Sequence, residues 1–419
     1  MNPRVVVTGM GIISPVGLDL RTAWHNLLSS RSGIQPITAF DACGFDVRIA
    51  GEAHGFDPLC VLSAKEARRT DRFVQFAAAA LEEALVQSRL TVGSNAYEIG
   101  AIIGSGVGGI GTYTTELDIL NKKGPRRVSP FLIPSITVDV PSVYVALRTG
   151  AKGPNFGLAS ACSTGADAIG QAFEAIRRGH AKAMFSGGFE AAITPIGIAA
   201  FDQMRALSHL NDDPGGASRP FDGKRDGFVM AEGGALLVLE ALEFALRRGA
   251  EPLAEILSYA STSDAVHLTS PDMDGCGAAV CMSLAMQRAR IRPEDVIYIN
   301  THGTGTPSGD SAETRAIKLA FGERAYQLLC SSTKSMTGHM LAGAGAFEAA
   351  VCIQALRTGV VPPTINLHNL DPECDLDYVP NRAQKVRLRF ALSNAFGFGG
   401  HNSCLIFKKY VRRARVMRP

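Results

Sequence analysis

The stretch ASACSTGADAIGQAFEAIRRG, residues 159–179, holds one cysteine among small residues, followed by an evenly amphipathic segment that stops at glycine. This pattern predicts a strand that ends near Cys162 and a helix that begins there. Free main-chain N–H groups and the positive end of the helix dipole lie at such a junction, and both favour thiolate over thiol. Cys162 is therefore a candidate nucleophile, although a buried structural cysteine is the commoner use of this residue type.

Short apolar segments bounded by glycine alternate with helical patterns along the rest of the chain. The expected strands are residues 4–13, 98–106, 183–188, 234–240, 254–260, 296–300, 328–332 and 402–407. The expected helices are the Cys162 helix and residues 69–88, 276–291 and 345–359. Strands that alternate with helices predict an α/β fold with buried, largely parallel sheets.

Two segments share one plan, which suggests an internal duplication. Residues 157–179 and 328–359 each contain a strand end of small residues, a turn, a helix and then Arg-x-Gly, although any two βα units look alike. A chain of 419 residues also suits two packed halves with a cleft between them. We expect a first half at 1–250, a second half at 251–410 and a basic, disordered tail at 411–419.

Composition argues against several classes of protein. The net charge of +3 is small, so nothing global points to a nucleic-acid partner. The nine cysteines are scattered and form no CxxC pair, which supports neither a zinc site nor a disulfide framework. No apolar run is long enough to cross a bilayer, and the first residues lack a signal-peptide pattern. We therefore expect a reducing, cytoplasmic setting and no membrane span.

Two histidines occupy similar positions at strand-to-helix junctions. His302 follows an apolar strand, and His339 lies in a Gly/Ser/Thr-rich segment before a helix. A lone histidine is more often a core or surface residue than a catalyst, but two in such paired settings are candidates for catalysis. Lys334 and Glu348 flank His339 and could orient it by charge-assisted hydrogen bonds, unless they form a surface ion pair. A zinc site made of both histidines and Cys162 lacks the usual local ligand spacing.

Two glycine-rich stretches could approach a ligand closely. GSGVGG, residues 104–109, matches the dinucleotide-binding pattern GxGxxG, but no acidic residue ends a strand about 20 residues later. Its backbone is better read as the lining of a narrow apolar channel. SNAFGFGGHNS, residues 393–403, places Phe396 and Phe398 among glycines. Such a loop can aim an N–H group at a substrate oxygen and let a phenylalanine swing, or it is a plain turn.

Together these motifs resemble the β-ketoacyl-acyl carrier protein synthases of the condensing-enzyme family, and most closely the type II elongating synthases. The resemblance rests on ACSTG around Cys162, HGTGTPSGD from His302, STKSMTGHMLAGAG around His339, and NAFGFGGHN at residues 394–402. It implies a thiolase fold, with two similar α/β halves forming a five-layered α-β-α-β-α core, in a homodimer. It also implies that malonyl-acyl carrier protein condenses with a Cys-bound acyl chain, which gives 3-oxoacyl-acyl carrier protein and CO2 in fatty-acid elongation without a cofactor.

The resemblance also assigns roles around the reacting groups. Cys162 carries the acyl chain as a thioester, and His302 and His339 hold the malonyl thioester while it loses CO2. Lys334 and Glu348 support the two histidines. No metal is expected. This scheme agrees with the chemistry, because a cysteine thioester is easily attacked and neutral imidazoles can stabilise an enolate.

Further roles concern the acyl chain and the carrier protein. The N–H groups of Cys162 and Phe398 form the oxyanion hole, and the acyl pocket with its gate comprises Val107, Phe398 and Gly399. The acidic carrier protein would dock on basic residues, each of which could equally belong to a solvated basic face. These residues are Lys65, Arg68 and Arg69 on one face of an early helix, Arg126 and Arg127 in a loop, and Arg205.

The sequence departs from the family pattern at three places. Thr301 stands where a small residue is common, and His401 stands where threonine is common and adds a third imidazole near the site. The basic tail extends past the usual end. A thiolase would need a second catalytic cysteine in GFGGHN, and a silent chain-length-factor subunit would lack Cys162. A ketosynthase subunit of a type II polyketide or specialised-lipid pathway remains the alternative.

Overall fold

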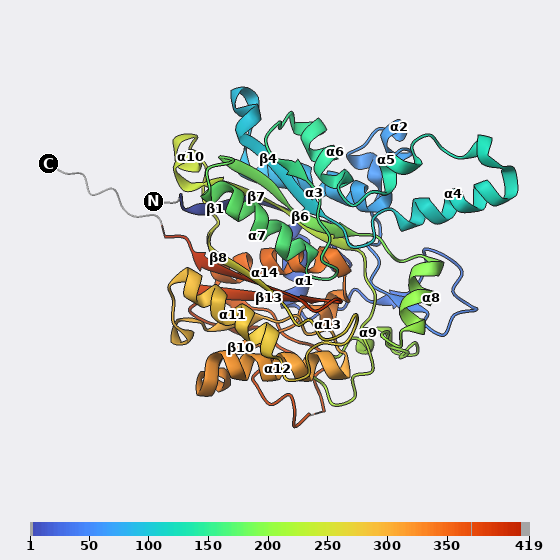
Figure 1. Ribbon diagram of the computed structural model, residues 1–419. Coiled ribbons are helices and arrows are strands. Elements are labelled where there is room, and N and C mark those ends of the chain that lie inside the picture. The colour runs from blue at the N-terminus through green and yellow to red at the C-terminus, as the bar shows by residue number, and fades with distance from the viewer. Residues whose placement is uncertain (1–2, 370, 412–419) are drawn as a thin grey trace.

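The computed structural model describes residues 3–369 and 371–411, and a single ten-stranded sheet runs through it (Figure 1). In spatial order the strands are β10 (Leu329–Ser331), β9 (Tyr298–Asn300), β13 (Phe390–Gly397), β14 (His401–Lys409), β8 (Ala254–Ser263), β1 (Val5–Ile13), β7 (Gly233–Ala241), β6 (Ala183–Glu190), β4 (Ile99–Gly104) and β5 (Asn155–Phe156). Two small sheets pair β2 (Gln35–Pro36) with β3 (Ile49–Ala50), and β11 (Val360–Val361) with β12 (Gln384–Lys385).

The strand order confirms the predicted duplication. Outward from the antiparallel contact between β1 and β8, one half runs β1-β7-β6-β4-β5 and the other runs β8-β14-β13-β9-β10. Corresponding pairs have the same direction in both halves: the two inner pairings of each half are antiparallel, and the two outer pairings are parallel. The expectation of largely parallel sheets is therefore wrong. In the second half a turn of three residues joins β13 to β14, and so short a connection can only reverse the chain.

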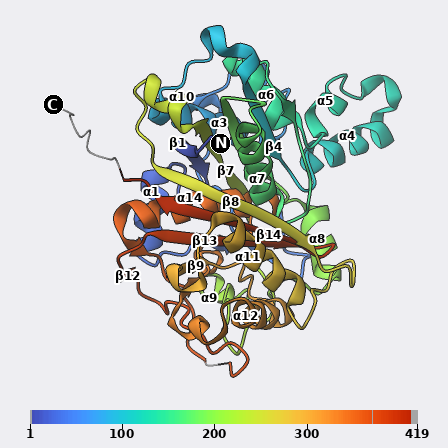
Figure 2. The same ribbon diagram turned by 60° about the vertical axis from the view of Figure 1, so that its left-hand side comes forward.

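Helices build the remaining layers around the two half-sheets. α3 (Arg72–Ser88) and α6 (Val140–Thr149) cover the first half, and α11 (Cys276–Ala289) with α12 (Pro307–Phe321) covers the second. α7 (Thr164–Arg177) and α14 (Ala344–Thr358) contact strands of both halves and lie between them (Figure 2). α14 is buried at every residue from 344 to 356, as a helix in a central layer must be. The five-layered α-β-α-β-α core is thus present.

Further helices complete the structure, and the last of them, Lys334–Thr337, is buried at every residue. They are α1 (Leu20–Leu28), α2 (Ala64–Ala67), α4 (Ile110–Lys123), α5 (Leu132–Ile136), α8 (Pro195–Gln203), α9 (Pro214–Ala217), α10 (Leu242–Arg247) and α13 (Lys334–Thr337). α4 and α5 project from the core in both views (Figures 1 and 2).

Most of the expected strands and helices are present. The strand expected to end near Cys162 does not form, because β5 ends at Phe156 and α7 begins at Thr164. The sequence interpretation also missed several elements, among them β13, α6 and α12. The division near residue 250 stays a prediction, because α14 of the second half packs on β7 of the first and the halves interlock. The predicted tail, apart from Val411, lies outside the described residues.

Candidate active site

Cys162 lies in a tight turn immediately before α7. Ser163 is the N-cap of the helix, so the cysteine is just outside the first helical turn rather than on it. Ala161 has a positive φ of 50°, which is rare for a residue with a side chain and marks a strained backbone. Asp167 of α7 accepts hydrogen bonds from the hydroxyls of Ser160 and Ser163, which holds this turn in place. Cys162, which follows Ala161, lines a pocket.

The Cys162 thiol is buried, with 8% of the residue exposed. Burial raises the pKa of this thiol to about 11, while the main-chain N–H of Phe398 and the charge of Lys334 lower it. Main-chain N–H groups thus favour the thiolate as expected, but desolvation outweighs them, so the thiol is protonated in the free protein. The N–H groups of Cys162 and Phe398 both act on the sulfur, as two donors of an oxyanion hole would.

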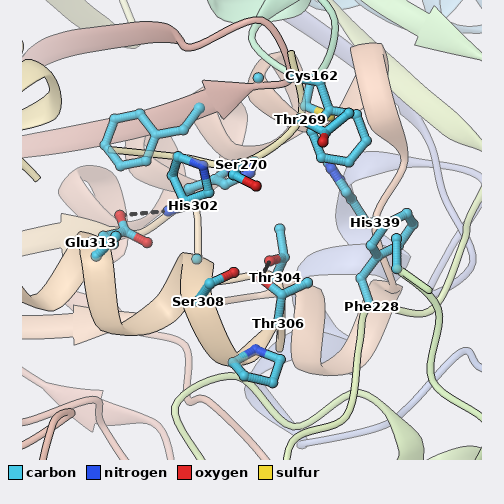
Figure 3. Close-up of a pocket in the computed structure, with 18 of the residues that line it drawn as sticks. Cys162, Phe228, Thr269, Ser270, His302, Thr304, Thr306, Ser308, Glu313 and His339 are labelled. Carbon is cyan, nitrogen blue, oxygen red and sulfur yellow. Dashed lines mark hydrogen bonds between the residues drawn. The ribbon is translucent and has the colours of Figure 1, made fainter. Parts of the chain in front are cut away.

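Cys162, His302 and His339 line one cavity of about 270 Å³, between the two halves (Figure 3). The imidazole ring centres of the two histidines are 5.4 Å apart and nearly perpendicular. Among the described residues, the buried Nδ1 atoms of both rings lack a hydrogen-bond partner. Burial and the positive charge of Lys334 hold the pKa of both histidines well below the usual value, and His339 also lowers that of His302. Both rings are therefore neutral near pH 7.

Lys334 and Glu348 form a buried ion pair, not the surface pair that was the alternative reading. The Lys334 Nζ donates a hydrogen bond of 2.6 Å to the main-chain oxygen of His302. The expectation that the pair hydrogen-bonds His339 is therefore wrong, because the ammonium reaches the backbone of the other histidine. Burial raises the pKa of Glu348 to about 7, although Lys334 opposes this shift. Lys334 thus positions His302 and keeps both imidazoles neutral.

Glu313 of α12 is a site residue that the sequence interpretation missed. Its carboxylate accepts the N–H groups of His302 at 2.8 Å and Gly303 at 2.7 Å, as the dashed line on His302 marks in Figure 3. The side-chain amide of Asn394 donates to the same carboxylate at 3.1 Å. Burial raises the pKa of Glu313. The sequence did hold a signal for Glu313. This acidic residue follows His302 by eleven positions, in a helix that begins at Pro307 and ends before Gly322, and both of these residue types mark helix ends.

The aromatic loop is the tight hairpin between β13 and β14. Phe398 lines the cavity, and its ring stacks on Phe201 with centres 6.4 Å apart. Gly399 has a φ of 86°, and its N–H donates to the Leu268 oxygen at 2.7 Å. The positive φ of Gly399 allows the chain to reverse direction between β13 and β14. The hydrogen bond to Leu268, in the segment after β8, holds the loop in place.

Four other expected residues lie off the cavity, and Gly399 is one of them. Val107 is 43% exposed and is not among the residues that line it. His401 is exposed at the start of β14 beside Gly399, so its imidazole does not join the two histidines in the pocket. Thr301 is buried next to His302 and is not among the lining residues.

The expected docking residues are all exposed. α2 ends at Ala67, so Arg68 and Arg69 follow the helix, and the predicted shared helical face is wrong. The chain turns there because Asp71 caps the next helix, α3. The Arg69 guanidinium lies 4.2 Å from the centre of the Phe131 ring. Phe131 follows Arg126 and Arg127 closely along the chain, so this contact joins the two basic segments. Arg205 lines the mouth of the cavity.

The described part of the chain shows neither a metal-binding cluster nor a helix suited to a membrane. No group of three His, Cys, Asp or Glu side chains there has an arrangement that could hold a metal ion. Across residues 3–369 and 371–411, no helix combines the length and apolar character of a membrane span. All nine cysteines are free, and Cys43, Cys60 and Cys276 are exposed.

Comparison with known proteins identifies the family. Residues 2–245 match the model described as beta-ketoacyl synthase, N-terminal domain, and residues 253–368 match the corresponding C-terminal domain. The chain is 51% identical over 408 residues to a 3-oxoacyl-[acyl-carrier-protein] synthase 2 from Synechocystis sp., covering 97% of this chain and 98% of the relative. It is 49% identical over 410 residues to the Staphylococcus aureus protein of that name, covering 98% and 99%.

Solved structures show the same architecture. A β-ketoacyl synthase from Burkholderia phymatum has a TM-score of 0.90 at 33% identity, covering 98% of this chain and all of that one. A type II polyketide ketosynthase in complex with its acyl-carrier protein has a TM-score of 0.89 at the same identity and coverage. The chain therefore belongs to the β-ketoacyl synthase family.

Proposed function

We propose that this β-ketoacyl synthase catalyses the decarboxylative Claisen condensation of malonyl-acyl carrier protein with an acyl chain on Cys162, in fatty-acid elongation. The observation that carries the proposal is the meeting of Cys162 with two neutral histidines in one cavity. The relatives named 3-oxoacyl-[acyl-carrier-protein] synthase 2 support this reaction.

The first step is acyl transfer. The sulfur of Cys162 attacks the carbonyl carbon of the acyl thioester, and the carbonyl oxygen becomes an oxyanion beside the N–H groups of Cys162 and Phe398. The bond between carbon and the carrier sulfur then breaks, and the proton of the Cys162 thiol ends on the departing carrier thiol. The raised pKa of Cys162 fits a thiol that loses its proton only as the reaction proceeds.

The second step is decarboxylation. The bond between the malonyl carboxyl group and the neighbouring carbon breaks, CO2 leaves, and the electron pair forms an enolate. His302 and His339 stabilise the enolate oxygen by donating N–H groups, which neutral imidazoles can do. One preorganised donor of this kind contributes about 2.7–4 kcal/mol. Lys334 and Glu313 contribute indirectly, because they hold the backbone of His302.

Condensation completes the cycle. The enolate carbon attacks the thioester carbon on Cys162, so a carbon–carbon bond forms and the carbon–sulfur bond breaks. The released thiolate takes a proton from solvent. The products are 3-oxoacyl-acyl carrier protein and CO2. A polyketide role is not favoured, because identity to the polyketide ketosynthase is 33% whereas identity to the relatives named synthase 2 reaches 51%.

The proposal extends to partners and location. Acyl carrier protein docks on the basic clusters around Lys65, Arg68, Arg69, Arg126 and Arg127, with Arg205 at the cavity mouth. Val107, Phe398 and Gly399 control access of the acyl chain. A homodimer is supported by the apolar side chains that α4, α5 and β5 expose, among them Tyr113, Ile133 and Phe156. A cytoplasmic location completes the proposal.

The reaction can be tested with purified components. The enzyme is mixed with carrier protein that bears an acyl chain and with carrier protein that bears malonyl, and the products are analysed by mass spectrometry. We expect one 3-oxoacyl-carrier protein for each CO2 released, and no product from Cys162→Ala. Product formation by that variant at the wild-type rate would refute the proposal.

A further inference from the structure

Glu190, the last residue of β6, is a fully buried carboxylate that the mechanism above does not use. Its Oε1 accepts a hydrogen bond of 2.7 Å from the hydroxyl of Ser105, and its Oε2 accepts one of 2.8 Å from the N–H of Gly106. The N–H of Val107 approaches Oε1 at 3.4 Å. No salt bridge to Glu190 occurs in the described part of the chain. Burying such a group is costly, so these donors must compensate for lost hydration.

The contacts of Glu190 connect three segments around the nucleophile. The first is the loop 105–108, in which the Ser105 hydroxyl also accepts the N–H of Gly108 at 3.0 Å. The second is the 3₁₀ turn Leu341–Gly343, whose Ala342 N–H lowers the pKa of the carboxylate. The third is the Cys162 turn, which Glu190 reaches only through Gly106: a Cβ on Gly106 would lie 2.9 Å from the Glu190 Oε2 and 3.8 Å from the Ala161 oxygen. Gly106 therefore lies between the carboxylate and the turn that contains Cys162.

Charge links Glu190 to Cys162 as well. The negative charge of Glu190 raises the pKa of the thiol, which opposes the effect of Lys334. Burial raises the pKa of Glu190 itself to about 7. The cavity that the thiol faces is also lined by His302 and His339, which are neutral, and by the charged or titratable side chains of Arg205, Asp264, Asp272 and Glu313. At the pH where the thiol ionises, Glu190 is therefore fully charged.

We propose that Glu190 is a positioning residue for acyl transfer, which holds the loop 105–108 against the Cys162 turn and places its negative charge near the thiol. The inference rests on the proposed function, in which Val107 of this loop controls access of the acyl chain. Glu190 is not among the residues that line the cavity. It acts on the acyl half of the reaction, whereas malonyl decarboxylation depends on the histidines across the cavity.

Two variants separate the charge from the hydrogen bonds. Glu190→Gln removes the charge, and Glu190→Asp keeps it on a shorter side chain that loses contact with the loop. Glu83→Gln is the matched control, because Glu83 is also largely buried and accepts the N–H groups of Ile12 at 3.0 Å and Leu20 at 2.9 Å. Glu83 is not among the residues that line the cavity.

The first readout is alkylation of Cys162 by iodoacetamide as a function of pH, which needs no substrate. We expect Glu190→Gln to shift the profile to lower pH and to raise the rate at pH 8 by about threefold or more. Glu190→Asp and Glu83→Gln should keep the wild-type profile. An unchanged profile in Glu190→Gln overturns the electrostatic part of the inference.

The second readout compares acyl transfer from long-chain and short-chain carrier thioesters with malonyl decarboxylation. Both Glu190 variants should change the ratio of the long-chain to the short-chain acyl-transfer rate by about threefold or more. Their rates of malonyl decarboxylation should stay within about twofold of the wild-type rate. Equal losses of all three activities would instead indicate general damage and overturn the positioning role. If these variants fold poorly, Ser105→Ala removes the bridging hydroxyl and should change the ratio without shifting the alkylation profile. Absence of acyl transfer in the wild type would refute the proposed function, whereas the alkylation profile would still test Glu190.

Discussion

Replacing Gly397 by alanine should impair the oxyanion hole without removing any functional group. Gly397 is the last residue of β13 and precedes Phe398. A Cβ at this position would lie 2.7 Å from the Ser160 oxygen and 3.1 Å from the Cys162 nitrogen. Both neighbours are backbone atoms and cannot rotate away. The backbone must therefore shift by a few tenths of an ångström, which separates the two proposed N–H donors.

The size of the effect follows from the proposed role of those donors. Loss of one oxyanion-hole donor lowers the rate by about 10² to 10³, and Gly397→Ala displaces a donor rather than deleting it. We therefore expect acylation of Cys162 to slow by about 10- to 100-fold. The affected contacts are local to one hairpin, so the melting temperature should fall by only a few degrees, about what 1 kcal/mol produces.

The assay is the time course of acylation, followed by intact-protein mass spectrometry. Gly44→Ala is the control, because a Cβ on Gly44 meets nothing within 4 Å. Acylation of Gly397→Ala at the wild-type rate would refute the reasoning. An equal loss in Gly44→Ala would show that the effect is not specific to the hairpin.

Two further predictions concern charge. Lys334→Met removes the positive charge that lowers the pKa of both pocket histidines. The rings of the variant should therefore protonate at a higher pH than those of the wild type. When the solution is acidified, malonyl decarboxylation by the variant should begin to decline at that higher pH. The same variant leaves Glu348 unpaired and should destabilise the fold by about 3–5 kcal/mol, measured by urea unfolding; an unchanged acid limb of the pH profile would contradict the electrostatic role. Arg68→Glu with Arg69→Glu should raise the KM for carrier-bound substrates about tenfold, and the wild type should slow as salt rises. A small carrier-free thioester serves as the control, and equal losses with both substrates would rule out this docking face.

The sequence was a good guide to the parts of the fold that burial determines. Strands such as β1 and β7 are apolar along their length because other layers cover both faces, and their patterns are clear. The cysteine turn was visible because a reactive group among small residues precedes a helical pattern. β13 was missed because glycine and asparagine near its end resemble a loop, and its pairing with β14 and β9 is a tertiary property.

Side-chain partners within the site could not be predicted in the same way. Lys334 is near His339 in sequence, but its ammonium reaches the backbone of His302, which lies on another element. Glu313 and Glu190 act on main-chain N–H groups, and such contacts leave no spacing pattern in the sequence. The thiol pKa depends on desolvation, which needs the packed structure to assess.

The central claim is that Cys162 carries the acyl chain while His302 and His339 act on malonyl. It is tested most directly by following acylation and CO2 release together in His302→Ala supplied with both carrier thioesters. The account predicts an acyl group on the Cys162 peptide and CO2 release lowered by about 100-fold or more. Release of CO2 at the wild-type rate, or an acyl group on Cys330 or Cys352 in place of Cys162, would contradict it.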